Sequence, residues 1–290
     1  MALDSMQDIF DEVERSGKPF WQVVRDADAG EKELPTEYSM EKMHRTWQAM
    51  LESVTNYQPT RRSVSGLVGG DGARMRDYNE NCQPLCGDYL QQVIATALCV
   101  GEANACMQKI VAAPTAGACG VLPAVLVPLY QQGKATEDEI VKALYVSAGI
   151  GMIIGFRASI AGASGGCQAE IGSASAMAAG TLVALRGGDH RQIGHAVAMA
   201  LKNLMGLICD PIAGLVEVPC VKRNVIGAVN AVSCADMALA GVTSRVPVDQ
   251  VIDCMGDVGR RLPVEFRETA LGGLADTPYG REVKRKMHQG

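Results

Sequence analysis

Apolar residues recur three or four positions apart through most of this 290-residue chain, which is the spacing of one face of an α-helix. Thr136 and Glu139 carry the signature of a capping box, so we expect a helix from there to about Gly155. Another helix fits between Pro35 and Asn56. Near the N-terminus, one helix face is made of Leu3, Met6, Ile9, Phe10 and Val13. Further helices are expected over residues 87–108, 121–132, 174–186, 190–206, 223–241 and 248–256.

No segment shows the strict alternation of apolar and polar residues that is typical of a β-strand. Aromatic residues make up only 4% of the chain, while alanine, glycine, methionine and leucine dominate it. This composition favours close helix packing over strands, which prefer β-branched and aromatic residues. We therefore predict an all-α fold, in which glycine- and proline-rich loops converge on a site.

Four glycine- or proline-rich connections separate the predicted helices, at residues 65–73, 112–120, 161–172 and 210–219. The last three lie in the most apolar part of the chain. Buried loops are unusual because backbone N–H and C=O groups need hydrogen-bond partners. We therefore expect these three loops to line one site together.

The chain has no internal repeat and no low-complexity linker, so we predict a single domain over residues 1–290. Within it, residues 1–60 form a helical N-terminal extension, residues 61–275 the core, and residues 276–290 a basic tail. A hydrophobic content of 48% is ample for a buried core. The charge-free run 110–133 contains three prolines and three glycines, which favours protein interior over a membrane span.

The formal net charge is -5, and the one basic cluster lies at residues 281–286 in the predicted tail. Nucleic acid is therefore not expected as a partner. The first residues, M-A-L-D-S-M-Q-D, are acidic where a secretory signal would be basic. We expect a cytoplasmic protein with no membrane partner.

Ten cysteines in a cytoplasmic chain favour free thiols or metal ligands over disulfides. Cys167, Cys209 and Cys220 have the spacing C-x41-C-x10-C, which is neither a zinc-finger nor a ferredoxin pattern. Each lies in or beside a loop whose free amides can donate hydrogen bonds to a thiolate. A shared metal site and three separate buried thiols both remain open, and Cys82 and Cys86 form a rival pair. The other five cysteines mostly fall on predicted helices as small core residues.

Three thiolates on a cubane iron-sulfur cluster would leave one iron without a protein ligand. Such an iron is a Lewis acid that can labilise a hydroxyl group, so the chemistry would be dehydration. The loop at residues 112–120 leads into a helix, where the Thr115 hydroxyl and free amides are placed to bind a carboxylate; a plain turn is the alternative. The histidines form no metal-ligand pair. Acid-base candidates without an assigned role are Lys109, Glu170, Asp210, Lys222, Arg223 and Asn224.

Three segments carry a family resemblance: A-P-T-A-G-A-C-G, A-S-I-A-G-A-S-G-G-C-Q-A-E-I-G and C-D-P-I-A-G-L-V-E-V-P-C-V-K-R-N. Over about residues 15–275 the chain resembles the alpha subunit of bacterial iron-sulfur-dependent L-serine dehydratases. The resemblance implies a [4Fe-4S] cluster on Cys167, Cys209 and Cys220, with no pyridoxal phosphate. The implied reaction is that of an L-serine ammonia-lyase, which converts L-serine to pyruvate and ammonia in amino-acid degradation and gluconeogenesis.

The resemblance also implies a substrate pocket at Thr115, Ala116, Gly117, Ser164 and Gly165. It covers only the alpha part of the family, without the S-S-H-T-type histidine motif of the beta part. The catalytic base is therefore expected on a separate beta subunit, in a heterodimer or larger alpha/beta oligomer. The alternatives are a related lyase on threonine or cysteine, and a non-enzymatic iron-sulfur protein with Cys119 or Cys86 as a fourth ligand.

Overall fold

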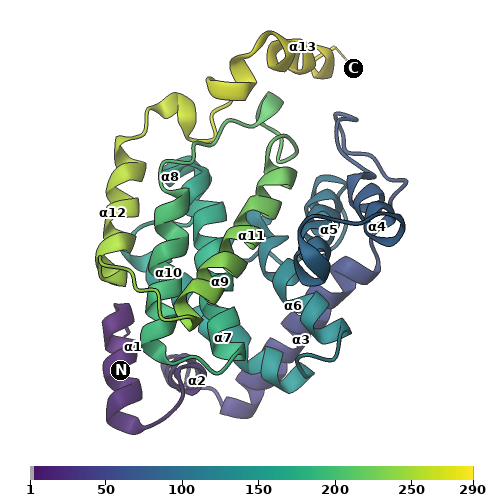
Figure 1. The fold of residues 1–290 in the computed structure, drawn as a ribbon. Helices are drawn as coiled ribbons and strands as arrows, with labels where there is room; N and C mark the ends of the chain where they lie inside the picture. The colour runs from purple at the N-terminus through teal and green to yellow at the C-terminus, as the bar shows by residue number, and fades with distance from the viewer. Residues whose placement is uncertain (1–2, 290) are drawn as a thin grey trace.

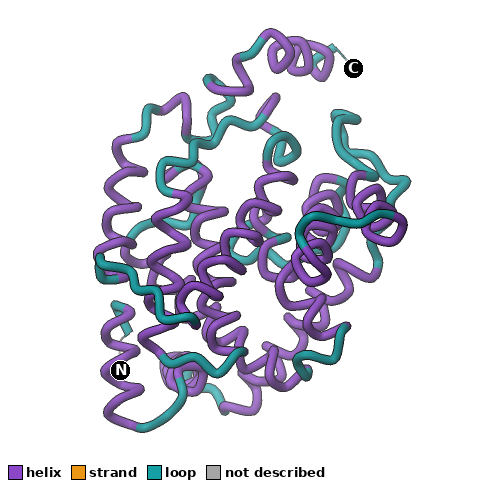
Figure 2. Tube along the Cα trace, in the orientation of Figure 1, coloured by secondary structure: helices purple, strands orange, loops and turns teal. Residues whose placement is uncertain are grey.

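The computed structural model describes residues 3–289, which fold into helices joined by loops, with no β-strand among them (Figures 1 and 2). The predicted all-α class is confirmed. The helices are α1 (Met6–Ser16), α2 (Phe20–Glu31), α3 (Thr36–Thr55), α4 (Asp71–Asn81), α5 (Gly87–Ala105), α6 (Val121–Gln131), α7 (Glu137–Arg157), α8 (Gly162–Gly165), α9 (Ser173–Leu185), α10 (His190–Leu204), α11 (Cys220–Leu239), α12 (Val248–Arg261) and α13 (Pro278–Met287). Single helical turns are η1 (Ala116–Ala118), η2 (Gln168–Gly172), η3 (Ile212–Gly214), η4 (Val264–Phe266) and η5 (Gly273–Asp276).

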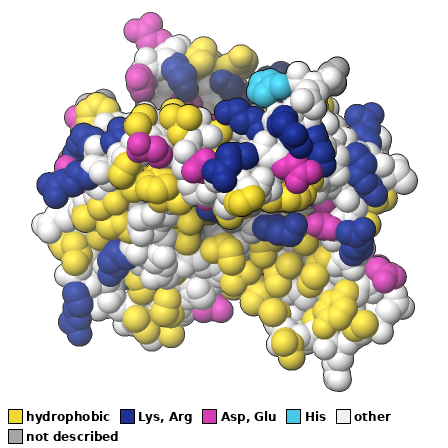
Figure 3. All heavy atoms as spheres, turned by 90° about the horizontal axis from the view of Figure 1, so that it is seen from above, with side chains coloured by type: hydrophobic (Ala, Val, Ile, Leu, Met, Phe, Trp, Pro, Cys, Tyr) yellow, Lys and Arg dark blue, Asp and Glu magenta, His cyan; other side chains and the backbone are white. Residues whose placement is uncertain are grey.

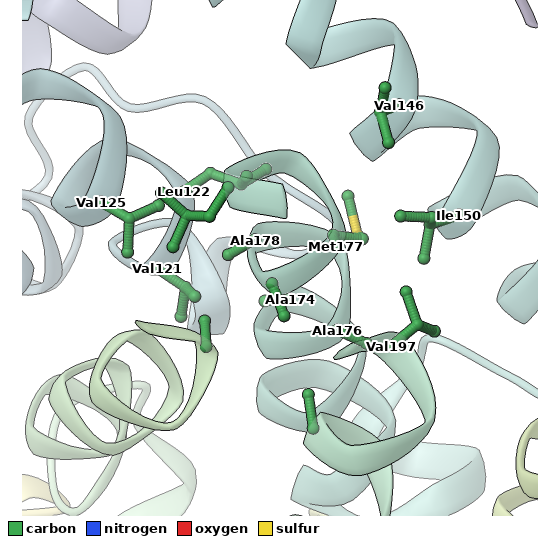
Figure 4. Close-up of a cluster of buried hydrophobic side chains, with 14 of the residues drawn as sticks. Val121, Leu122, Val125, Val146, Ile150, Ala174, Ala176, Met177, Ala178 and Val197 are labelled. Carbon is green, nitrogen blue, oxygen red and sulfur yellow. The ribbon is translucent and has the colours of Figure 1, made fainter. Parts of the chain in front are cut away.

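Helix α9 is the centre of the fold, packed against α6, α7, α10 and α11 (Figure 1). Its residues from Ser173 to Val183 are all buried, and most of them are small, which lets the surrounding helices approach closely. Figure 4 shows part of this core, with side chains of α9 lying among those of α6, α7 and α10. The labelled side chains are Val121, Leu122, Val125, Val146, Ile150, Ala174, Ala176, Met177, Ala178 and Val197.

The first three helices share this core. Met6, Phe20 and Trp47, one each from α1, α2 and α3, belong to the same continuous cluster of buried side chains as α9. Helix α5 packs between α4 and α11, and α12 packs on α10. The end of the molecule that carries α8 and α13 lies opposite the N-terminus (Figure 1).

The capping box that the sequence predicted at the start of α7 is present. The Thr136 hydroxyl accepts from the Glu139 amide at 3.3 Å, and the Glu139 carboxylate accepts from the Thr136 amide at 2.7 Å. Among the described helices, α7 alone is long and apolar enough to cross a membrane. Since 61% of its most apolar stretch is buried inside the fold, it is a core helix by position.

Several elements differ from the sequence prediction. The loop predicted over residues 65–73 is wrong at its end, because α4 begins at Asp71. Helix α4 buries only Gly72, so its sequence has no apolar face from which a helix could be predicted. Helix α2 was not predicted either. Residues 276–290, predicted as a tail, contain α13, which packs against η3. The loop predicted over residues 161–172 holds the turns α8 and η2.

The close packing around α9 can be tested at Gly180. A Cβ there would lie 2.4 Å from Ile150 Cδ1 and 3.2 Å from Val197 Cγ2, so Gly180→Val overpacks the contact of α9 with α7 and α10. We expect a loss of about 1–3 kcal/mol in the free energy of unfolding, measured by urea denaturation. Gly30→Val on α2 is the control, because nothing lies within 4 Å of its Cβ position. Equal stability of the two variants would contradict this packing.

Candidate functional site

Three cysteines from separate segments come together at the end of the bundle that carries α8. Cys167 lies between α8 and η2, Cys209 in the loop after α10, and Cys220 is the first residue of α11. All three are buried, at 3%, 3% and 8% exposure. Burial raises the pKa of each thiol, to about 12 for Cys167 and Cys220. The charges of Cys167 and Cys220 also raise the pKa of Cys209, so the three thiols lie near enough to one another for their charges to interact.

Two carboxylates complete the group. The Cys209 thiol and the carboxylate oxygens of Glu170 and Glu268 lie within 4.8 Å of one another. The Thr115 hydroxyl donates to Glu170 Oε1 at 2.7 Å, which brings the loop before α6 into the site. Burial raises the pKa of Glu170, although the Thr115 hydrogen bond opposes this shift. This half-buried carboxyl therefore favours its neutral form more than a solvent-exposed glutamate does.

Two glycines let the backbone approach these carboxylates. A Cβ on Gly162 would lie 2.6 Å from Glu170 Oε2 and 3.0 Å from Glu268 Oε2. A Cβ on Gly117 would lie 3.1 Å from Glu170 Oε1. Small residues at these positions keep the space beside Glu170 open.

Asn224 holds the loop before α6 to the start of α11. Its side chain is 1% exposed, accepts from the Gly120 amide at 2.8 Å and donates to the Gly117 carbonyl at 2.8 Å. It also donates to the Cys220 carbonyl at 3.0 Å. The position of Gly117 is thereby fixed relative to Cys220.

An ion pair between Arg223 and Asp210 lies beside the cysteine group. Arg223 on α11 donates to Asp210 Oδ1 and to the Ile208 carbonyl, both at 2.8 Å. The Asp210 side chain is 4% exposed and also accepts from the Leu274 amide at 2.9 Å. The loop that carries Cys209 is therefore tied both to α11 and to the segment before α13.

Two further buried carboxylates fix the loop before α4. Glu217, at 4% exposure, accepts from the Ser63 hydroxyl at 2.6 Å and from the Ser65 hydroxyl. Glu102, at 1% exposure, accepts from the amides of Asp71 and Gly72 at 2.8 and 3.1 Å. Lys222 then pairs with Asp71 at 3.1 Å, which links this loop to the turn of α11 after Cys220.

Comparison with known proteins decides the family. Residues 15–275 match the sequence model described as the serine dehydratase alpha chain. The chain belongs to this family. It is 44% identical over 254 residues to the probable L-serine dehydratase alpha chain of Bacillus subtilis (strain 168), covering 88% of this chain and 82% of the relative. It is 39% identical over 284 residues to the L-serine dehydratase alpha chain of Peptoniphilus asaccharolyticus, covering 98% and 97%.

Longer relatives exist within the serine dehydratase family. An L-serine dehydratase of Escherichia coli (strain K12) is 43% identical over 181 residues, which is 62% of this chain but only 40% of the relative. The alpha-chain relatives thus match along nearly their whole length, whereas the others contain a large additional region.

The residues that the family resemblance placed in a substrate pocket lie in different environments. Thr115 and Gly117 are half-buried beside Glu170, and Ala116 is exposed. Ser164 is exposed on α8. Gly165 is buried, and a Cβ on it would lie 2.9 Å from Ala169 Cβ, so close packing against η2 favours a glycine there.

The acid-base candidates also separate. Glu170, Asp210, Arg223 and Asn224 belong to the site, whereas Lys109 pairs with Glu52 of α3 at 2.6 Å. Sequence reasoning missed Glu268, because it lies in a loop without a motif. It reaches the site because residues 266–268 run beside Cys209, with the Glu268 amide donating to the Cys209 carbonyl at 3.2 Å.

The remaining cysteines mostly follow expectation. Cys99, Cys106, Cys119 and Cys234 are buried, but Cys254, expected as a small core residue, is exposed. The rival pair Cys82 and Cys86 is exposed on either side of a turn. A cavity of about 880 Å³ lies elsewhere, between α2, α3 and α7, and its lining includes none of these cysteines.

The anchoring role of Asn224 predicts a stability loss. Asn224→Ala removes the partners of a buried amide and a buried carbonyl, so we expect the metal-free protein to lose about 1–3 kcal/mol in urea unfolding. Asn81→Ala on α4 is a matched control, because Asn81 is exposed and hydrogen-bonds within its own helix. A loss no larger than that of the control would disprove the anchoring role.

The raised pKa of Glu170 predicts a pH dependence. As pH rises from below the ordinary glutamate pKa to above the raised one, the unfolded chain releases this proton first, so the folded state loses stability. Glu170→Gln removes this decline, and the variant should gain stability relative to the parent protein as pH rises. Urea unfolding of both metal-free proteins across acidic to neutral pH measures the difference. Parallel stability curves would contradict the assignment.

Proposed function

We propose that this chain is the alpha subunit of a [4Fe-4S]-dependent L-serine dehydratase that converts L-serine to pyruvate and ammonia. The observation that carries the proposal is the buried group formed by Cys167, Cys209 and Cys220 in a chain of the serine dehydratase alpha family. The L-serine dehydratase activity for which the alpha-chain relatives are named supports L-serine as the substrate.

The donor set suits an iron-sulfur cluster. Cys167, Cys209 and Cys220 are free thiols, and thiolate sulfur is the preferred ligand of such clusters. Burial keeps these thiols protonated, so binding must release protons, as it does at metal sites generally. When bound through these three residues, the cluster supplies one iron without a protein ligand as a Lewis acid for the substrate hydroxyl. Pyridoxal phosphate has no part in this proposal.

The loop before α6 is the proposed carboxylate site. The amides of Ala116 and Gly117 have no hydrogen-bond partner among the described residues, and Ala116 is exposed. Free amides in a loop held rigid by Asn224 can donate to the carboxylate of an amino acid. Thr115, Ala116 and Gly117 would bind that carboxylate. Ser164 and Gly165 belong to α8, whose Gly162 lies against Glu170, and would line the same pocket.

We infer that a beta subunit covers this site and supplies the base. His44 and His190 pair with Glu137 and Glu14, on elements that contribute no cysteine to the group. Lys and Arg side chains spread across the end of the molecule seen in Figure 3, with hydrophobic side chains between them. Exposed apolar residues follow α12 in sequence, namely Val264, Leu271, Leu274 and Tyr279. Such a surface suits a protein partner, giving a heterodimer or larger oligomer.

Anaerobic reconstitution of the alpha chain with its beta chain tests this function. Cys167→Ser, Cys209→Ser and Cys220→Ser should each lose iron, sulfide and pyruvate formation, because each removes one cluster ligand. Cys234→Ser is the matched control. Cys234 is also buried, but its thiol hydrogen-bonds to Asn203 and Asn230, and it is not one of the three proposed cluster ligands.

The same preparation separates the alternatives. The parent protein should turn over L-serine faster than L-threonine or L-cysteine, and serine should change the absorption spectrum of the cluster. A faster rate with cysteine or threonine would assign the enzyme to that substrate. If serine leaves the absorption spectrum of the cluster unchanged even with the beta chain present, the chain is a non-enzymatic iron-sulfur protein.

A further inference from the structure

The cysteine group concentrates negative charge in a buried space. To hold iron, the buried Cys167, Cys209 and Cys220 must all become thiolates, and the half-buried Glu170 and the exposed Glu268 lie beside Cys209. Like charges at this separation repel strongly where water is excluded. A nearby cation is needed to offset this repulsion.

Arg223 is placed to be that cation. Its side chain is 16% exposed and lies on the first turn of α11, which begins at Cys220. Its guanidinium donates to the residues on both sides of Cys209. By contrast, the adjacent Lys222 is 69% exposed and points to Asp71 of α4.

The guanidinium is held in place at these two points. Its Nη1 donates to the Ile208 carbonyl and its Nη2 to Asp210 Oδ1, so the loop that carries Cys209 fixes its orientation. Asp210 is in turn held by the Leu274 amide, and the Cβ position of Gly273 lies 2.5 Å from Asp210 Oδ2. The planar fork of arginine can serve several acceptors at once, which the single ammonium of lysine cannot.

We propose that Arg223 is a positioning residue for the cluster: its charge and its hydrogen bonds on both sides of Cys209 retain the iron and raise the reduction potential of the bound cluster. This inference rests on the cluster proposed above. Residues that hydrogen-bond to the metal-binding segment without touching the metal often contribute about 10- to 100-fold to the affinity of the protein for its metal. The positive charge also favours the reduced state, which carries one more electron than the oxidised state.

Three variants test the proposal in the reconstituted alpha/beta protein. Arg223→Met removes the charge and the contacts, Arg223→Lys keeps the charge alone, and Lys222→Met is the control one residue away. Retention is measured as the rate of iron loss to a chelator, and the potential by anaerobic reductive titration with dithionite. Urea unfolding of each metal-free variant reports any damage to the fold separately.

We expect Arg223→Met to hold iron roughly 10- to 100-fold less tightly than the parent, with a more negative reduction potential. Arg223→Lys should keep a potential close to that of the parent while losing part of the retention. Lys222→Met should match the parent in both measurements.

A parent protein that binds no cluster would refute the proposed function itself. Parental retention and potential in Arg223→Met would refute only the role of Arg223. A variant that loses iron in proportion to its loss of metal-free stability, at an unchanged potential, would show that Arg223 is merely structural and would also overturn the proposal.

Discussion

The ion pair between Arg223 and Asp210 is the interaction on which the geometry of the cysteine group depends. It joins the first turn of α11 and the loop after α10 to the segment before α13, which lies about fifty residues further along the sequence. Because Asp210 is buried and Arg223 is largely buried, at 4% and 16% exposure, removing Arg223 would leave the Asp210 charge without compensation, at a cost of up to about 3–5 kcal/mol. The pair therefore serves less to stabilise the protein than to specify one arrangement of its loops.

Around that pair, the fold repeatedly uses buried polar side chains to fix irregular backbone. Asn224 holds the loop before α6, Glu217 holds the two serines before α4, and Glu102 holds the first amides of α4. Each satisfies backbone or hydroxyl groups that no helix could pair. Loops can therefore lie inside the bundle, and their unpaired amides at Ala116 and Gly117 remain free for a ligand.

The sequence predicted what depends on local pattern. Apolar spacing located α6, α7, α9 and α10 within a few residues, because each has a buried face or is buried all round. Helix α4 escaped because its side chains face water, and α11 began earlier than expected because Cys220 directly follows Pro219 at the helix cap.

The site divides in the same way. The small residues and prolines around Cys167, Cys209 and Cys220 set these cysteines apart from the others. The family motifs predicted that the three cysteines bind an iron-sulfur cluster. The carboxyl group of Glu268 reaches Cys209 only through a contact between chain segments far apart in sequence, and no local pattern reports such a contact.

The order of the cysteines along the chain has a consequence for stability. Between Cys167 and Cys209 the chain passes through the whole of α9 and α10. A cluster bound to both ends would close that stretch into a covalent loop and lower the entropy of the unfolded chain, as a disulfide does. Loss of iron would thus change the topology of the chain as well as its chemistry, by releasing the central helix from a cross-link.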